Sequence, residues 1–230
     1  DVADRFADYG RICFERFGDR VKNWITLNEA WCSAFLGHGN AYFAPGRKSA
    51  SEPYLAGHNL LRAHAYIVDV YRRDFQAEQQ GQIGITNNCD WREPASDSEG
   101  DKAAAQRSLE FFLGWFTDPI YFGDYPAVMR ERVGDRLPQF SEGDAALLKG
   151  SSDFLGLNHY TTMITAEPRK HVHGTGDVKG NGGMMEDQQV EHSADPDWEQ
   201  TDMGWNIVPW GCRKLLEWID QRYDHPPIYL

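Results

Sequence analysis

The chain has 230 residues with a net charge of −12, and hydrophobic residues make up 41% of it. This length and hydrophobic content suffice for one large packed domain or a piece of one. The acidic balance argues against binding to nucleic acid, because phosphate recognition needs a basic surface. No apolar run approaches the roughly 20 residues that cross a bilayer, so we also predict no membrane partner.

The cysteines are dispersed and form no C-x-x-C pair: Cys13, Cys32, Cys89 and Cys212. Closely spaced cysteines would indicate a zinc or redox site, whereas dispersed ones are typical of reduced, buried thiols. We therefore predict a cytoplasmic protein without a metal site. No signal peptide is visible, although the chain starts at Asp1, and we expect both of its ends to be truncated.

The first predicted element is a helix that ends before Gly18. Its apolar face is expected to comprise Val2, Phe6, Tyr9, Cys13 and Phe17. A short strand follows over residues 23–28, where Ile25 and Leu27 alternate with polar neighbours. The sequence thus begins with a helix that leads directly into a strand.

A long helix is predicted from about Tyr54 to Gln79. Its apolar side is expected to comprise Leu55, Leu61, Ala65, Val68 and Phe75. The stretch QIGITNN then predicts a second strand near residues 83–87. Capping residues open a further helix in the stretch SDSEGDKAAAQRSLEFFLGWFTD.

Two short helices are predicted in the stretches DYPAVMRERVGDRLP and SEGDAALLKGSS, and a third strand near residues 153–160. Residues 167–205 show little periodicity and are predicted to form a long exposed loop, of a kind that is usually functional or mobile. An amphipathic helix in PWGCRKLLEWIDQRYDH precedes the last strand, at 227–230.

This alternation of helices and strands predicts an α/β fold with parallel strands and right-handed helical crossovers. An open doubly wound sheet and a closed eightfold barrel both fit the order. A nucleotide-binding sheet would carry a glycine-rich turn after a strand, and the chain has neither a G-x-G-x-x-G motif nor a Walker loop. A nucleotide site is therefore not expected.

Polar side chains follow each of the first three predicted strands. They are, in chain order, Asn28 and Glu29, then Asn87 and Asn88, then Asn158, His159 and Tyr160. Because the carboxyl ends of parallel strands meet at one edge, we expect a functional site there. Glu29 would then be a catalytic acid, although taken alone it could also be a helix cap or a surface charge.

Several motifs occur in a fixed order: ITLNEAW, APG, HNLLRAHA, GQIGITNNCDWREP, FLGLNHYT, MGWNIVPWG and PPIYL. In this order and spacing the chain resembles the family 1 glycoside hydrolases, which are retaining β-glucosidases and relatives on a (β/α)8 TIM barrel. The resemblance extends over residues 1–230. It implies that these residues are the central part of a single barrel domain, about strands four to seven.

The resemblance implies that Glu29 is the acid/base of the T-x-N-E-P motif and that Asn28 hydrogen-bonds the sugar 2-hydroxyl. It implies that Tyr160 contacts the nucleophilic carboxylate, with Asn158 as its neighbour. Two positions near the leaving-group subsite are implied as well, Trp31 and Asn88. The expected ligand is a β-glucoside or a related small saccharide, with no cofactor. The chemistry agrees, because cleavage needs a proton donor at the leaving oxygen and a second carboxylate at the anomeric carbon.

The chain departs from the family pattern in two places. Ala30 replaces a proline that would fix the turn after Glu29. The family nucleophile lies in an E-N-G motif a few residues after PPIYL, where the sequence stops. We expect the complete enzyme to hydrolyse β-glucosides or β-galactosides with retention, and residues 1–230 alone to be inactive. The alternative is an inactive barrel fragment or a sugar-binding relic.

Other residues have competing interpretations. Exposed loop positions are favoured over a metal site for four histidines that lack H-x-x-x-H spacing, which are His38, His171, His173 and His192. His58 and His64 lie six apart on a helix and are expected to pack or to hydrogen-bond. Trp31 fits a core position as well as a subsite wall, and Tyr160 could serve packing alone. The segment 167–205 is expected to cover the rim that holds Glu29.

Overall fold

The computed structural model describes residues 1–168 and 183–230 of the chain. In this part, a sheet of parallel strands has the order β1-β2-β4-β7. The strands are β1 (Asn23–Asn28), β2 (Gln82–Asn88), β4 (Leu155–Asn158) and β7 (Ile228–Tyr229). The predicted strands are confirmed, and the third is shorter than the sequence suggested.

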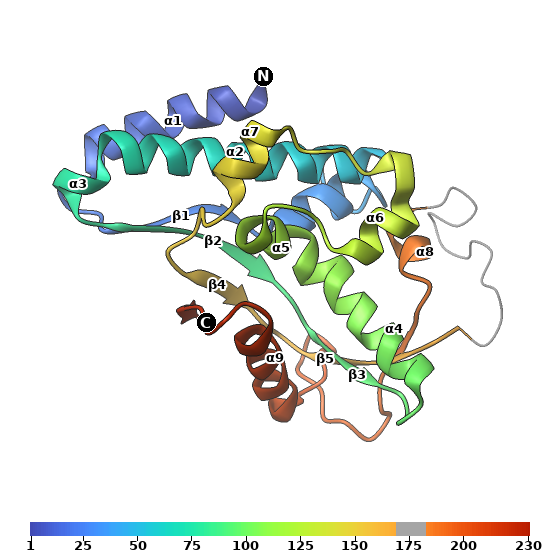
Figure 1. The fold of residues 1–230 in the computed structure, drawn as a ribbon. Coiled ribbons are helices and arrows are strands. Elements are labelled where there is room, and N and C mark those ends of the chain that lie inside the picture. The colour runs from blue at the N-terminus through green and yellow to red at the C-terminus, as the bar shows by residue number, and fades with distance from the viewer. Residues whose placement is uncertain (169–182) are drawn as a thin grey trace.

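Helices connect the strands, and α1 lies along α2 on one side of the molecule (Figure 1). The α-helices are α1 (Val2–Phe17), α2 (Glu52–Asp74), α3 (Gln76–Gln79), α4 (Glu99–Leu109), α5 (Trp115–Phe122), α6 (Ala127–Val133), α7 (Glu142–Leu148), α8 (Met184–Gln188) and α9 (Pro209–Arg222). Two π-helical turns, η1 (Cys32–Leu36) and η2 (Glu110–Gly114), and a 3-10 turn, η3 (Gly134–Arg136), complete the set. Each helix expected from the sequence is confirmed, although the long one ends at Asp74 and resumes as α3.

A second, small sheet follows the carboxyl ends of β2 and β4 in the chain. The sequence did not predict it. Its strands are β3 (Trp91–Pro94), β5 (Thr162–Ala166) and β6 (Glu191–Ser193), in the order β3-β5-β6. β3 pairs parallel with β5, whereas β5 and β6 are antiparallel. The prediction of an irregular loop over residues 167–205 is therefore wrong for α8 and β6. Residues 169–182 of that segment lie outside the described part.

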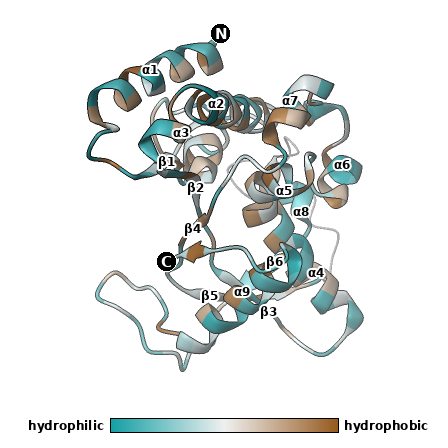
Figure 2. Ribbon diagram, turned by 60° about the vertical axis from the view of Figure 1, so that its left-hand side comes forward, coloured by the Kyte–Doolittle hydropathy of each residue, from teal (hydrophilic) through white to brown (hydrophobic). Residues whose placement is uncertain are grey.

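The main core fills the space between α2, α5 and β2. Tyr54 on α2 packs against Trp115, and Trp115 stacks on Phe116 with ring centroids 4.8 Å apart. Ile83 and Ile85 of β2 are fully buried, because helices cover one face of this central strand and the other lines the interior. Figure 2 shows hydrophobic residues, in brown, along the strands β2 and β4.

The predicted apolar face of α1 is wrong at Val2, Tyr9 and Phe17, whereas Phe6 and Cys13 are half-buried and Phe6 packs against the core. Val2, Tyr9 and Phe17 are 62%, 60% and 48% exposed. The face that contacts α2 instead carries the small residue Gly10, where an added Cβ would lie 2.3 Å from a side-chain carbon of Ile67. The buried face of α1 thus carries Ala3, Gly10 and Phe14, with Gly10 allowing the close approach of the two helices and Phe14 filling the core.

On α2 the predicted apolar side is confirmed at Leu61, Ala65 and Val68, which are all buried. Leu55, in contrast, is 54% exposed. Its neighbours Pro53, Tyr54 and Gly57 are buried, so the first turn is covered by the core and Leu55 lies on the solvent side of it. At 3.6 residues per turn, Leu55 is not on the face of Leu61 and Ala65, so it was wrongly assigned to that face.

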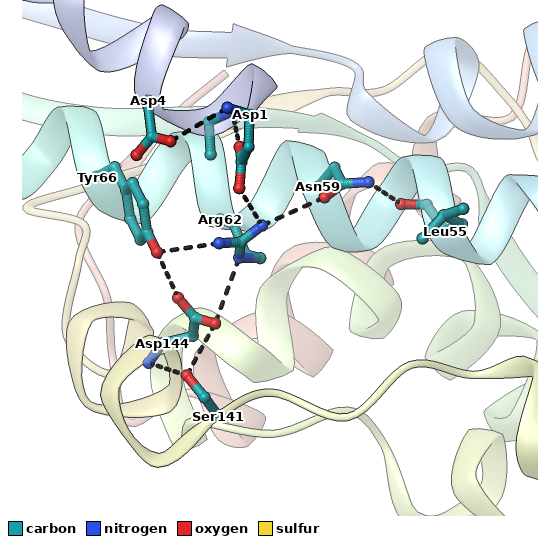
Figure 3. Close-up of polar contacts among 9 residues, drawn as sticks. Asp1, Asp4, Leu55, Asn59, Arg62, Tyr66, Ser141 and Asp144 are labelled. Carbon is teal, nitrogen blue, oxygen red and sulfur yellow. Dashed lines mark hydrogen bonds and ion pairs between the residues drawn. The ribbon is translucent and has the colours of Figure 1, made fainter.

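A polar network centred on Arg62 joins α1, α2 and α7 (Figure 3). The Arg62 guanidinium donates to Asp1 over 2.8 Å and to Asp144 over 3.3 Å. Tyr66, one turn further along α2, donates its hydroxyl proton to the other oxygen of Asp144 over 2.9 Å. Since each carboxylate belongs to a different element, this network fixes α1 and α7 against the same turn of α2.

The two α2 histidines hydrogen-bond inside the protein, as the sequence predicted. His64 is fully buried, with Nδ1 2.7 Å from the Thr26 hydroxyl and Nε2 3.0 Å from the Ser151 hydroxyl. Burial lowers its pKa to about 3. Nδ1 of His58 lies 3.0 Å from the Tyr125 hydroxyl. Neither histidine is part of a metal site in the described residues.

Candidate active site

The strands β1, β2 and β4 end side by side, and their last residues pair across the sheet. Asn88 lies opposite Asn158, and Asn28 lies opposite Thr86. The backbone N–H of Glu29 donates to the Thr86 carbonyl over 2.8 Å, so Glu29 stays attached to the neighbouring strand just after β1 ends. The structure thus brings together at one edge the polar residues that the sequence placed there.

The half-buried Glu29 carboxylate receives donors on both oxygens. The Asn158 amide donates to Oε1 over 2.7 Å, and the Tyr160 hydroxyl donates to the same oxygen over 3.2 Å. On the other side, the Cys32 thiol lies 3.3 Å from Oε2. The Asn158 amide also reaches Asn28 Oδ1 over 3.1 Å. Four of the predicted site residues therefore form one connected group.

The backbone of Glu29 has an unusual conformation, with φ of 51°. A non-glycine residue in this left-handed region costs about 1 kcal/mol or more, and such conformations cluster at functional sites. The turn lets the Glu29 carbonyl accept from the backbone N–H groups of Cys32 and Ser33, which starts the helical segment that follows. Ala30, where the resemblance would place a proline, is buried inside this turn.

Trp31 precedes Cys32 in the chain, and Asn88 contacts the Cys32 side chain. The Trp31 ring stacks on Phe112, with centroids 4.1 Å apart, so one of its faces belongs to the core. The buried amide of Asn88 donates from Nδ2 to the Cys32 sulfur over 3.5 Å. Asn88 thus reaches Glu29 through Cys32, a residue that sequence reasoning missed. The three-residue spacing of Glu29 and Cys32 gave no usable signal, because Glu29 has a positive φ and stands outside the helical turn that Cys32 opens.

Both acidic donors to Glu29 keep their protons at neutral pH. Burial, followed by the hydrogen bond from the thiol to Glu29, raises the pKa of Cys32 to about 12. Burial and the charge of Glu29 also raise the pKa of Tyr160. Because a thiol and a phenol can donate only while protonated, these shifts keep both hydrogen bonds in place.

An aromatic residue from the segment 167–205 packs beside the carboxyl ends of the strands, next to Tyr160. Trp205 meets the Tyr160 ring edge-on, with centroids 4.8 Å apart, and is 40% exposed. The neighbouring Asn206 carbonyl accepts from the Thr161 hydroxyl over 2.8 Å, which ties this part of the segment to the end of β4. The expectation that the segment lies over the rim of Glu29 gains support from these contacts.

Residues 1–168 and 183–230 contain no group of three or more side chains suited to a metal ion. The prediction that His192 is an exposed loop residue is wrong. It lies half-buried in β6, with Nδ1 3.1 Å from the Thr165 hydroxyl. Burial lowers its pKa to about 3. His38 lies 3.8 Å from a Glu52 oxygen. Two of the histidines considered above lie outside the described residues, His171 and His173.

A parallel α/β sheet with a carboxylate at the carboxyl ends of its strands is typical of α/β enzymes, barrels among them. A family model described as Glycosyl hydrolase family 1 matches residues 1–230, and the chain belongs to this family. The comparison agrees with the resemblance inferred from the motifs. Every helix in the described part is too short or too polar to cross a membrane.

The chain is similar to plant and fungal β-glucosidases. It is 44% identical to Beta-glucosidase 4 of Oryza sativa subsp. japonica over 237 residues, which cover 100% of this chain and 47% of that protein. It is 43% identical to Beta-glucosidase 42 of Arabidopsis thaliana over 238 residues, again covering 100% of this chain and 47% of the relative. The chain therefore spans about half the length of the curated relatives it matches.

Solved structures give the same result. The crystal structure of a rice beta-glucosidase superimposes with a TM-score of 0.94 at 40% identity, covering 100% of this chain and 51% of that one. A family 1 beta-glucosidase from the fungus Humicola insolens, solved in complex with glucose, gives 0.86 at 40% identity and covers 99% and 49%. These relatives are (β/α)8 barrels, so the main sheet corresponds to part of such a barrel, as the motifs predicted.

Proposed function

We propose that the protein containing these residues hydrolyses β-glycosidic bonds as a retaining β-glucosidase-type enzyme, with Glu29 as general acid/base. The observation that carries the proposal is the Glu29 carboxylate at the carboxyl end of β1, held on Oε1 by Asn158 and Tyr160. Membership of glycosyl hydrolase family 1 and the similarity to named β-glucosidases support it.

In this proposal Glu29 donates a proton to the leaving oxygen and later removes one from water. Asn158 donates to Oδ1 of Asn28, which leaves the amino group of Asn28 to donate to a sugar hydroxyl. Trp31 and Asn88 lie on the leaving-group side of Glu29. A retaining mechanism needs a second carboxylate about 5 Å away at the anomeric carbon. No residue within 1–230 is assigned to that role, and the contact of Tyr160 with it stays a prediction.

The wider setting of the site is part of the proposal. We infer that residues 1–230 form the central part of one barrel domain, about strands four to seven, which fits the strand order and the half-length match. The substrate is a β-glucoside or a related small saccharide. A cytoplasmic location is supported by the four cysteines, which are all unpaired.

The test is Glu29→Gln in the protein expressed from its whole reading frame. We expect hydrolysis of cellobiose to fall about 100- to 10,000-fold, because its leaving group must be protonated. Cleavage of an activated dinitrophenyl β-glucoside should fall much less, and azide should restore turnover. The matched control is Glu78→Gln, which alters an exposed carboxylate on α3. An unchanged rate on cellobiose would contradict the assignment of Glu29.

A further inference from the structure

The contact between Cys32 and Glu29 has no role in the mechanism described so far. Cys32 opens the π-helical turn η1, and its backbone N–H donates to the Glu29 carbonyl over 2.9 Å. Its sulfur lies 3.3 Å from Oε2 of the same residue. With the backbone closed in this way, the thiol is held beside one oxygen of the carboxylate.

Asn88 fixes the direction of the thiol hydrogen bond. Its Nδ2 lies 3.5 Å from the sulfur, and an amide nitrogen can only donate. The sulfur therefore accepts from Asn88 and directs its own proton to Glu29. Asn88 is 9% exposed and stands at the end of β2, so the rigid sheet holds this donor in place.

The donors are divided unequally between the two oxygens of Glu29. Oε1 accepts from both Asn158 and Tyr160, whereas Oε2 accepts from Cys32. Each carboxylate oxygen has about two lone-pair positions for hydrogen-bond donors. The three donors therefore fill both positions on Oε1 and one on Oε2. The remaining position, on Oε2, is the one that can carry the catalytic proton.

We propose that Cys32, held by Asn88, is a positioning residue that orients Oε2 of Glu29 for proton transfer to the leaving group. The inference rests on the proposed function, since it concerns the same proton. Burial and the contact with Glu29 raise the pKa of the thiol to about 12, so Cys32 acts as a donor and not as a thiolate nucleophile.

The experiment compares Cys32→Ala and Cys32→Ser in the whole protein on two substrates. For cellobiose, whose cleavage depends on the proton, Cys32→Ala should lower kcat/KM about three- to tenfold, the effect of one hydrogen bond from a weak thiol donor. For dinitrophenyl β-glucoside, which leaves without protonation, the value should stay within about twofold. Cys32→Ser restores a donor of similar size and should recover most of the cellobiose activity.

The control is Cys13→Ala on α1, a half-buried thiol remote from the strand ends. This variant should leave kcat/KM unchanged for both substrates. Thermal melts of every variant separate loss of folding from loss of rate. An equal loss on both substrates, or a serine variant no better than alanine, would overturn the role of Cys32. If Glu29→Gln discriminates between the substrates and Cys32→Ala does not, only this inference fails. If Glu29→Gln does not discriminate, the proposed function fails and the inference fails with it.

Discussion

His64 links three parts of the protein through one side chain. It lies on α2 and contacts Thr26 of β1 and Ser151 in the segment before β4. The folded protein keeps its ring neutral, because burial lowers its pKa from 6.5 to about 3. An unfolded chain binds a proton at that ring near pH 6.5. The folded state is therefore favoured above this pH and loses stability as the pH falls toward 3.

We predict that the free energy of unfolding decreases below pH 6.5 by about 1.4 kcal/mol per pH unit from His64 alone. Urea melts at pH 7 and pH 5 measure this difference. In His64→Gln, which cannot titrate, the difference between the two pH values should shrink by about 2 kcal/mol. The variant will also be less stable at pH 7, so the test is the pH dependence alone. An unchanged pH dependence would show that the buried ring does take up a proton.

At the scale of elements, α9 is attached to α5 by a buried carboxylate. Asp118 accepts two bonds from the Arg222 guanidinium, over 3.0 and 2.6 Å, and one from the Tyr223 hydroxyl over 2.7 Å. The carboxylate is almost fully buried, so each bond compensates for lost hydration. This attachment places α9 against the helices that precede β4.

Asp118→Ala should lower the free energy of unfolding by about 3 kcal/mol, because it leaves the Arg222 charge with less compensation. Glu110, 3.0 Å from Arg222, limits the loss. Arg213→Ala on the same helix is the control. It removes an exposed pair with Glu217 and should change the stability by no more than about 0.5 kcal/mol. Equal effects of the two variants would argue against a special role for the buried pair.

The main elements could be predicted because their signals are local. The apolar run QIGIT and the capping serine Ser98 mark β2 and α4 in any context. The strands β3, β5 and β6 could not, because they are short, carry polar residues such as Arg92, and are defined by pairing between segments far apart in the sequence. The face of α1 was misjudged because the buried side includes Ala3 and Gly10, which do not register as apolar in a pattern, beside Phe14.

The residues of the candidate site also fall into those that could be predicted from the sequence and those that could not. Asn28, Glu29, Asn88 and Asn158 could be placed at one edge because each follows a predictable strand. The contact of Cys32 with Glu29 depends on a turn with positive φ, which no residue type in that stretch signals. The shared geometry of an active site is thus more predictable than the individual hydrogen bonds within it.

For the molecule as a whole, apolar surface is exposed along α1 and on the edge strand β1. Tyr9 and Ile12 on α1 are 60% and 56% exposed, and Ile25 on β1 is 56% exposed. β1 and β7 are the edges of the described main sheet, so each presents unpaired backbone groups. Such surfaces favour association when nothing covers them.

A polypeptide of residues 1–230 expressed by itself should therefore self-associate and show no hydrolysis of aryl β-glucosides. Size-exclusion chromatography, a thermal melt and the assay test this. Replacing the exposed pair, with Tyr9→Glu and Ile12→Lys, should reduce the association without restoring activity. A soluble monomer with a sharp melting transition would contradict the first expectation. Turnover that Glu29→Gln abolishes would contradict the second, because it would require a second carboxylate within these residues.

The distance in sequence between the partners of Glu29 has a kinetic consequence. Asn158 and Tyr160 lie 129 and 131 residues beyond it, and two helical crossovers separate β1 from β4. Contacts of such high sequence separation form slowly, since the entropy of closing the intervening loops is lost before any bond is gained. Helices such as α2 can form within microseconds, from neighbours in sequence. The carboxylate therefore acquires the donors Asn158 and Tyr160 late, when a refolding chain already has most of its helical content.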